Sequence, residues 1–264
     1  MPRLLQESPL WLLIPAWFVF FAALSVAARY AVRRIRSEER RTELADYAGK
    51  VLSPIGATFA FLIGFAATMT WSAISAGQEA VDAQSTSAQQ LAWATKSISD
   101  KAGAAEVVGN LERYLSVAVE QDPQFLATGD TTALPSARAL DTLQHSVHNV
   151  AYGNGASIPE AGAMTSAAAA LTAAQAKVSA VAQRSLPSLM VWLLVAAGGL
   201  LAATMGTAAA EMTRPILMYG WALVAAIALV LIVTLDVPFR GSIKVNMEPL
   251  AEVSSSLAGK PFNS

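Results

Sequence analysis

The sequence predicts an all-α integral membrane protein: four transmembrane helices in two hairpins, with an extramembrane helical bundle inserted between spans two and three. Of its 264 residues, 54% are hydrophobic and only 14% are charged, against roughly a quarter charged in an average globular domain. Four stretches contain no Asp, Glu, Lys or Arg. Each is long enough to cross a bilayer, for which a helix needs about 20 residues. These stretches are 9–28, 51–78, 185–210 and 215–235.

The first span, at about 9–28, is followed by a basic loop that completes segment 1–50. A cleaved signal peptide is a weaker interpretation of this span, because its positive charge would precede the apolar run instead of following it. The basic residues of the loop are Arg29, Arg33, Arg34, Arg36, Arg40, Arg41 and Lys50. Short loops rich in Arg and Lys stay in the cytoplasm, so we expect loop 29–50 to be cytoplasmic and both termini and segment 79–184 to be external.

The arginine cluster has two interpretations. We expect Arg33, Arg34, Arg36, Arg40 and Arg41 to fix the topology and to contact anionic lipid head groups. A nucleic-acid site is disfavoured because acidic residues dilute the cluster and no aromatic residues interleave with it.

Segment 79–184 is predicted to be a helical domain continuous with spans two and three. The second span, 51–78, runs on without a proline or turn cluster from Met69 to Ile98, and Ile74, Val81 and Ala88 recur every seven residues. Further helices are expected at about 105–121, from about 135, and from Ser157 or Pro159 into the third span near Pro187. Spans three and four then occupy 185–235, and 236–264 forms a C-terminal tail.

The sequence offers little catalytic chemistry. His145 and His148 share a helical face with Asp141, which could form part of a metal site, but solvated side chains are the better interpretation. No phosphate loop, nucleophile elbow or zinc-protease motif is present. We therefore expect no enzyme, no cofactor and no metal site.

No ionisable residue lies within the four apolar stretches, which disfavours a pump or coupled carrier. A passive pore remains compatible, because hydrophobic constrictions and dipoles can control permeation. Hydroxyl groups in span two could line such a pore or bond to carbonyls of their own helix. They belong to Thr58, Thr68, Thr70 and Ser72.

Two motifs resemble a known family. The tail TLDVPFRGSIKVNMEPL resembles the closing signature of the bacterial bestrophin-like family of unknown function, and LERYLSVAVEQDP resembles its middle at Tyr114, Asp122 and Pro123. The matching tail residues are Asp236, Pro238, Phe239, Gly241, Val245, Pro249 and Leu250. A structural role also accounts for the tail: proline ends span four, Asp236 accepts backbone N–H bonds and Phe239 lies at head-group level.

The stretch FLIGFAAT is similar to the second span of true bestrophins, which are pentameric chloride channels. The resemblance implies that Phe61 and Phe65 form a hydrophobic neck, with Ala57 one turn earlier. The positions that share this helical face are Ala57, Phe61, Phe65, Thr68 and Ser72, our candidate pore-lining residues. Ordinary packing against helices or lipid is the alternative, and no acidic cluster resembles the calcium clasp of bestrophins.

Two functions follow from these observations. The first is a homo-oligomeric, bestrophin-like passive channel of a bacterial plasma membrane, surrounded by lipid and conducting chloride or another small anion through a pore lined by span two. The alternative is a non-conducting accessory or assembly subunit that binds a membrane-complex partner through its external helical domain. Segment 79–184 carries ten acidic and six basic residues, a balance that would gather anions poorly.

Overall fold

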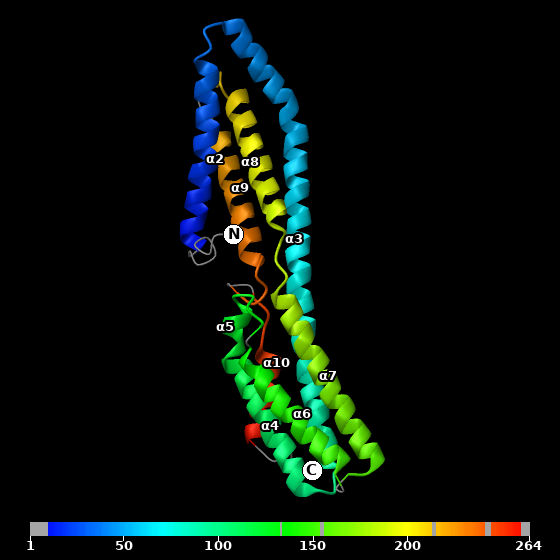
Figure 1. The fold of residues 1–264 in the computed structure, drawn as a ribbon. Helices are drawn as coiled ribbons and strands as arrows, with labels where there is room; N and C mark the ends of the chain where they lie inside the picture. Colours follow the sequence, from blue (N-terminus) through cyan, green and yellow to red (C-terminus); the bar gives the residue numbers. More distant parts are fainter. Residues whose placement is uncertain (1–9, 133, 154–155, 213–214, 241–243, 260–264) are drawn as a thin grey trace. The chain divides into compact units, whose positions relative to one another are not determined.

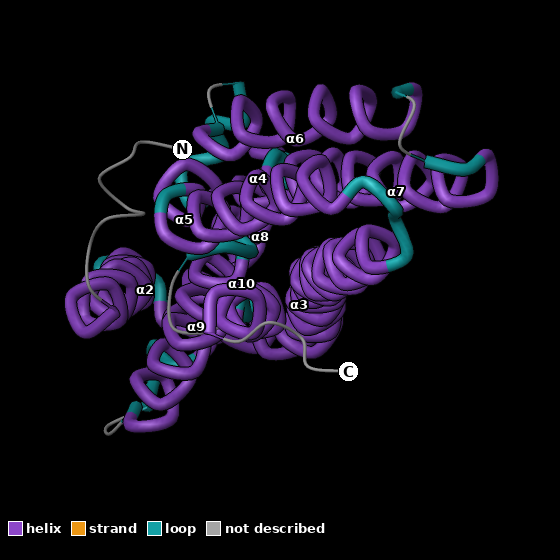
Figure 2. Tube along the Cα trace, turned by 90° about the horizontal axis from the view of Figure 1, so that it is seen from below, coloured by secondary structure: helices purple, strands orange, loops and turns teal. Residues whose placement is uncertain are grey.

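The computed structural model describes residues 10–132, 134–153, 156–212, 215–240 and 244–259, and within these ranges it is all-helical, as predicted (Figure 2). Four described helices are long and apolar enough to cross a membrane. The chain divides into two compact units: unit 1 is Met1–Trp71 with Ser185–Asp236, and unit 2 is Ser72–Arg184 with Val237–Ser264.

Unit 1 contains α2 (Leu10–Arg33), α8 (Ser188–Ala208), α9 (Ile216–Leu235) and the first part of α3 (Glu38–Lys96). Helices α2, α8 and α9 lie side by side (Figure 1). The predicted loop 29–50 is mostly helical instead, because α2 extends to Arg33 and α3 begins at Glu38. The first-turn acids Glu38 and Glu39 favour this early start of α3, since they oppose the positive end of the helix dipole.

Small residues let the helices of unit 1 approach closely. Ser25 of α2 is fully buried and donates its hydroxyl hydrogen bond to the carbonyl of Ala202 in α8, at 2.9 Å. A Cβ added to Gly198 of α8 would lie 3.0 Å from the rings of both Phe21 and Phe59. Membrane helices associate through close packing of small side chains. The hydrophobic effect does not drive them together, because lipid tails are as apolar as the helices.

Unit 2 contains the rest of α3 together with α4 (Lys101–Glu120), α5 (Asp122–Leu126), α6 (Pro135–Tyr152), α7 (Ile158–Ala182) and α10 (Glu248–Gly259). The heptad residues Val81 and Ala88 are fully buried, and so is Ile98 after the end of α3. Helix α3 is a single helix of 59 residues that ends at Lys96.

The ends of the unit 2 helices have clear local causes. Asp100 accepts hydrogen bonds from the N–H groups of Ala102 and Gly103 and caps α4. Ser157 and Glu160 form a capping box at the start of α7.

Two details of the prediction were wrong. The helix from Ser157 does not continue into the third span: α7 ends at Ala182 and α8 starts at Ser188. Pro187 favours the break, because a proline disfavours the helical conformation of the residue before it. Helix α10 was not expected, as the whole segment 236–264 was assigned to a tail.

Candidate functional site

The candidate pore-lining residues lie on an exposed face of α3. In unit 1, Phe61 is 71% exposed and Phe65 is 50% exposed, and Ala57 and Thr68 are exposed on the same face. The rings of Phe61 and Phe65 stack, with centroids 6.4 Å apart and planes inclined by 14°. The next residue of this face, Ser72, is also exposed.

The opposite face of α3 is buried in unit 1. Phe59 is 5% exposed and Ala66 is fully buried, and the ring centroid of Phe59 lies 6.0 Å from that of Trp221 in α9. Among the described residues, the helix thus has one face packed on its own chain and one face that stays exposed. That second face is left to contact lipid, another copy of the chain, or the solvent of a pore.

The three threonine hydroxyls of span two bond to their own helix. Thr58 donates to the carbonyl of Pro54 at 2.9 Å, Thr68 to that of Gly64 at 2.9 Å, and Thr70 to that of Ala66 at 3.1 Å. This is the back-bonding alternative. The donor of each hydroxyl is therefore occupied within the helix, and only the oxygen lone pairs of the exposed Thr58 and Thr68 remain for an ion or water.

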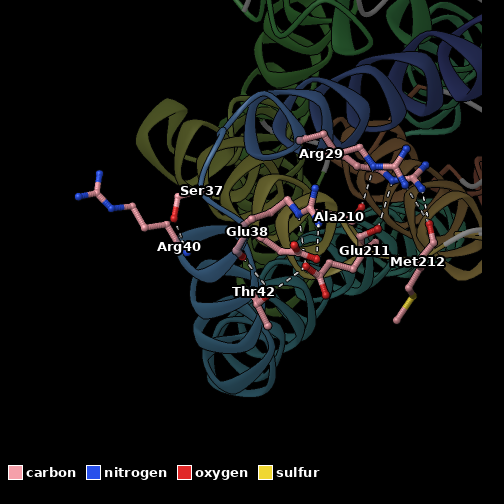
Figure 3. Close-up of polar contacts among 11 residues, drawn as sticks. Arg29, Ser37, Glu38, Arg40, Thr42, Ala210, Glu211 and Met212 are labelled. Atoms are coloured by element: carbon pink, nitrogen blue, oxygen red, sulfur yellow. Dashed lines mark hydrogen bonds and ion pairs between the residues drawn. The ribbon is translucent and has the colours of Figure 1, made fainter.

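Two arginines of α2 cap the carboxyl end of α8 (Figure 3). The Nε of Arg33 donates to the carbonyl of Ala210 at 2.7 Å, and the Nε of Arg29 donates to that of Ala209 at 3.2 Å. Both arginines also donate through Nη2 to the carbonyl of Met212. The last carbonyls of a helix lack intrahelical partners and carry its negative dipole end, so this contact stabilises the α2–α8 pair.

The other arginines of the predicted cluster divide into two groups. Arg41 lies 3.4 Å from Glu211, which also accepts the hydroxyl hydrogen bond of Thr42 at 3.0 Å. Arg34, just after the end of α2, donates to the hydroxyl of Tyr30 in that helix at 2.8 Å, while Arg36 and Arg40 have exposed side chains. Arg33 and Arg41 thus contact other parts of the chain, whereas Arg36 and Arg40 have side chains exposed to the surroundings.

The tail motif is built into the fold. Asp236 accepts a hydrogen bond from the backbone N–H of Leu186 at 2.5 Å, which joins the end of α9 to the start of the third span. The carbonyl of Pro238 accepts from the N–H of Val245 at 2.8 Å. Phe239 is only 6% exposed and belongs to unit 2, so its side chain packs against the protein. Gly241 lies outside the described residues.

The histidine face shows no metal-site geometry. Nδ1 of His145 lies 3.7 Å from a carboxylate oxygen of Asp141, and both side chains are about three-quarters exposed. The ring of His148 lies 4.6 Å from that of Tyr152, centroid to centroid. No group of three or more potential ligands capable of holding a metal occurs among the described residues.

A buried polar network in unit 2 was missed by sequence reasoning. Nε2 of Gln84 in α3 donates to the hydroxyl of Tyr114 in α4 and, at 2.7 Å, to Oε1 of Gln175 in α7. Tyr114 also donates to Oε1 of Gln175, at 3.0 Å. The Nε2 of Gln175 donates to Ser136 of α6 at 2.9 Å, and Ser136 donates its hydroxyl and its backbone N–H to Asp122 of α5.

Each of these five helices contributes one member to the network. The side chains of the five network residues are at most 6% exposed. Burial raises the pKa of the Tyr114 hydroxyl, and burial also raises the pKa of the Asp122 carboxyl, although the hydrogen bonds from Ser136 and Gln175 oppose that second shift. The family motif at Tyr114 and Asp122 was the available signal, but their partners Gln84, Ser136 and Gln175 stand at scattered positions without a pattern.

The fold and its exposed apolar helix are those of a multi-span membrane protein, and comparisons with known proteins identify its family. A family model of the Bestrophin-like domain matches residues 19–250. The chain therefore belongs to the bestrophin-like family, as the motifs indicated. No curated protein matches it.

Solved structures share the fold. One variant of a bacterial bestrophin homologue from Klebsiella pneumoniae is similar with a TM-score of 0.71 at 12% identity, over 93% of this chain and 97% of the other. Another gives 0.67 at 14% identity, over 92% and 99%. A structure described as a membrane protein gives 0.70 at 12% identity, over 92% and 97%.

Proposed function

We propose that this chain forms a homo-oligomeric passive anion channel, with the exposed face of α3 around a shared pore. The observation that carries the proposal is the two-sidedness of α3: Phe59 and Ala66 are buried in the chain's own core, while Phe61 and Phe65 are exposed. A ring of copies needs such an unoccupied helix face at its axis. Membership of the bestrophin-like family and the similarity of FLIGFAAT to the neck of bestrophin chloride channels support the same assignment.

The chemistry of this face suits a hydrophobic neck. Apolar constrictions stop ions by losing water, and small changes of diameter then switch permeation. In an assembly of several copies, Phe61 and Phe65, whose side chains stack, would each form one apolar constriction, one turn of α3 apart. Ala57, one turn before Phe61, would leave that level of the pore wider than a larger aliphatic side chain such as leucine would.

Chloride flux from liposomes tests this function. The wild-type protein is expected to release chloride above the rate of empty liposomes, and Phe61→Ala and Phe65→Ala are expected to raise the rate by widening the neck. Phe20→Ala is the matched control, because Phe20 is an exposed phenylalanine of α2. Wild-type flux at the background rate removes the channel, whereas flux that neither α3 variant changes removes this neck.

A non-conducting accessory subunit is the second candidate, favoured by the charge of segment 79–184, which has ten acids and six bases. A chain of this kind would bind its partner through the helical domain and need no axial pore. Cross-linking in native membranes separates the two functions: a ladder of homo-oligomers supports the channel, and a single heterologous product supports the subunit.

We also propose that segment 79–184 and both termini are external and that the turn between α2 and α3 is cytoplasmic, as the arginine distribution indicates. The chain has no cysteine, so one introduced thiol reports its side of the membrane. Ile158 is 91% exposed, and Ile158→Cys is expected to react with an impermeant thiol reagent on intact spheroplasts. Reaction only after lysis would reverse the orientation.

A further inference from the structure

The buried network of unit 2 has a direction. Every hydrogen bond at the Asp122 end points toward that carboxylate: Ser136 donates its N–H and its hydroxyl, and Gln175 donates Nε2 to the oxygen of Ser136. Farther along, Tyr114 and Gln84 donate to Oε1 of Gln175. An ionised carboxylate can only accept, so this arrangement fits the ionised state of Asp122.

The other end of the network is unsatisfied. Oε1 of Gln84, a residue that is only 1% exposed, is buried without a hydrogen-bond partner among the described residues. Buried polar atoms without a partner are uncommon and costly. In the orientation that fits an ionised Asp122, the side-chain oxygen of Gln84 therefore accepts no hydrogen bond.

Few charged groups act on Asp122. The ionisable group that faces it is the phenol of Tyr114 on α4, while α6 presents Ser136 and α7 presents Gln175. From the tail, Lys244 and Glu248 line a groove beside Pro123 and have exposed side chains. The Asp122 carboxylate thus accepts hydrogen bonds mainly from neutral donors. Gln121, the residue before it in sequence, lies at the surface.

We propose that Asp122 is a proton switch whose protonation reverses the hydrogen-bond chain and turns over the side-chain amide of Gln84 on α3. A proton from water adds to a carboxylate oxygen of Asp122, and the new O–H donates to Oγ of Ser136. The Ser136 hydroxyl then donates to Gln175, whose amide turns so that Oε1 accepts this bond. Nε2 of Gln175 now faces Gln84, whose amide turns in response. The Gln84 oxygen then accepts from Gln175 and Tyr114, and its Nε2 takes the position that the unpaired oxygen held.

The only covalent bonds that change in this sequence are the new O–H of Asp122 and the O–H that the solvent hydronium ion loses. Its consequence is that α3, the helix proposed to line the pore, senses the protonation of a carboxyl group on α5. The switch itself lies within unit 2 and does not depend on whether the chain conducts.

Infrared difference spectroscopy of the purified full-length protein, between about pH 7.5 and about pH 4.5, tests the switch. The wild type is expected to gain the carbonyl band of a buried protonated carboxyl and to show changes in side-chain amide bands. Asp122→Asn is expected to lose both signals. Asp141→Asn removes an exposed acid from α6 of the same unit and is expected to lose neither the buried band nor the amide changes.

The decisive variant is Ser136→Ala, which removes the hydroxyl that links Asp122 to Gln175. The carboxyl band should remain and the amide changes should disappear. Amide changes that persist in Ser136→Ala, or a wild type without a buried carboxyl band, would overturn the proposal. A chloride-flux assay that finds no conduction leaves this result standing and removes only the channel.

Discussion

Gly206 of α8 lies against the backbone of Ser25 in α2 so closely that a Cβ at Gly206 would come within 2.0 Å of the Ser25 carbonyl oxygen. The obstructing atom is backbone and cannot rotate away, so a larger residue must separate the two helices. The same two helices are joined nearby by the hydrogen bond from Ser25 to Ala202. Gly206 therefore fixes the distance between α2 and α8.

Gly206→Ala is expected to destabilise unit 1 by about 1–3 kcal/mol, the usual cost of overpacking a close-packed core. Thermal unfolding in detergent measures the change. Gly220→Ala is the matched control, because a Cβ at Gly220 in α9 would meet no atom within 4 Å. Equal melting temperatures for the two variants would contradict the close approach.

Arg33→Gln is expected to lower the stability of unit 1 by about 1 kcal/mol, because it weakens the contact with the carboxyl end of α8 and removes its opposing charge. Arg36→Gln removes an exposed arginine from the same turn region and should change stability far less. Urea unfolding in detergent compares the two. A smaller loss for Arg33→Gln than for Arg36→Gln would contradict the capping role.

The sequence was sufficient for the periodic features of this fold and insufficient for its polar contacts. The lengths of the four stretches without charged residues predict the four apolar helices. Heptad spacing predicts the extension of α3 through Val81 and Ala88. Both signals are repeated along the chain, so single residues matter little. The start of α3 at Glu38 was missed because a charged, arginine-rich segment has no apolar period, even though its acidic first turn favours a helix.

The candidate site divides in the same way. Residues 57, 61, 65, 68 and 72 share a face by helical geometry alone, and the structure leaves that face exposed. The roles of Arg33 and Phe239 depend on segments distant in sequence: Arg33 binds residues near 210, and Phe239 packs in the unit formed by 72–184 and the tail. Long-range contacts of single residues leave no spacing to detect, which is also why Gln84 and Gln175 were missed.

Asp236→Ala is expected to destabilise unit 1 by about 1–3 kcal/mol, because the N–H of Leu186, which is mostly buried, loses its acceptor. Asp236→Asn keeps an acceptor oxygen at the same place and should restore most of the loss. Thermal unfolding of the three proteins gives the ranking. Should the asparagine variant be as unstable as the alanine variant, the negative charge, not the hydrogen bond, would be the source of the stability.

The stability of unit 2 should depend on pH through Asp122. Burial raises the pKa of this carboxyl above its ordinary value of 3.8, so the folded state binds the proton more tightly than the unfolded state. The stabilisation from that proton is then fully present below the unfolded pKa and is lost as the pH rises through the raised, folded pKa. Asp122→Asn should flatten this part of the curve of unfolding free energy against pH.

Urea unfolding of the full chain at a series of pH values, followed by circular dichroism, measures this dependence. Asp141→Asn again provides the control, because its exposed side chain should leave the shape of the curve unchanged. Stability that instead rises with pH in the wild type, by an increment absent from Asp122→Asn, would mean that the donors Ser136 and Gln175 outweigh desolvation. The carboxyl would then be held ionised in the fold, with a depressed pKa, and the network would lock unit 2 in one state instead of switching it.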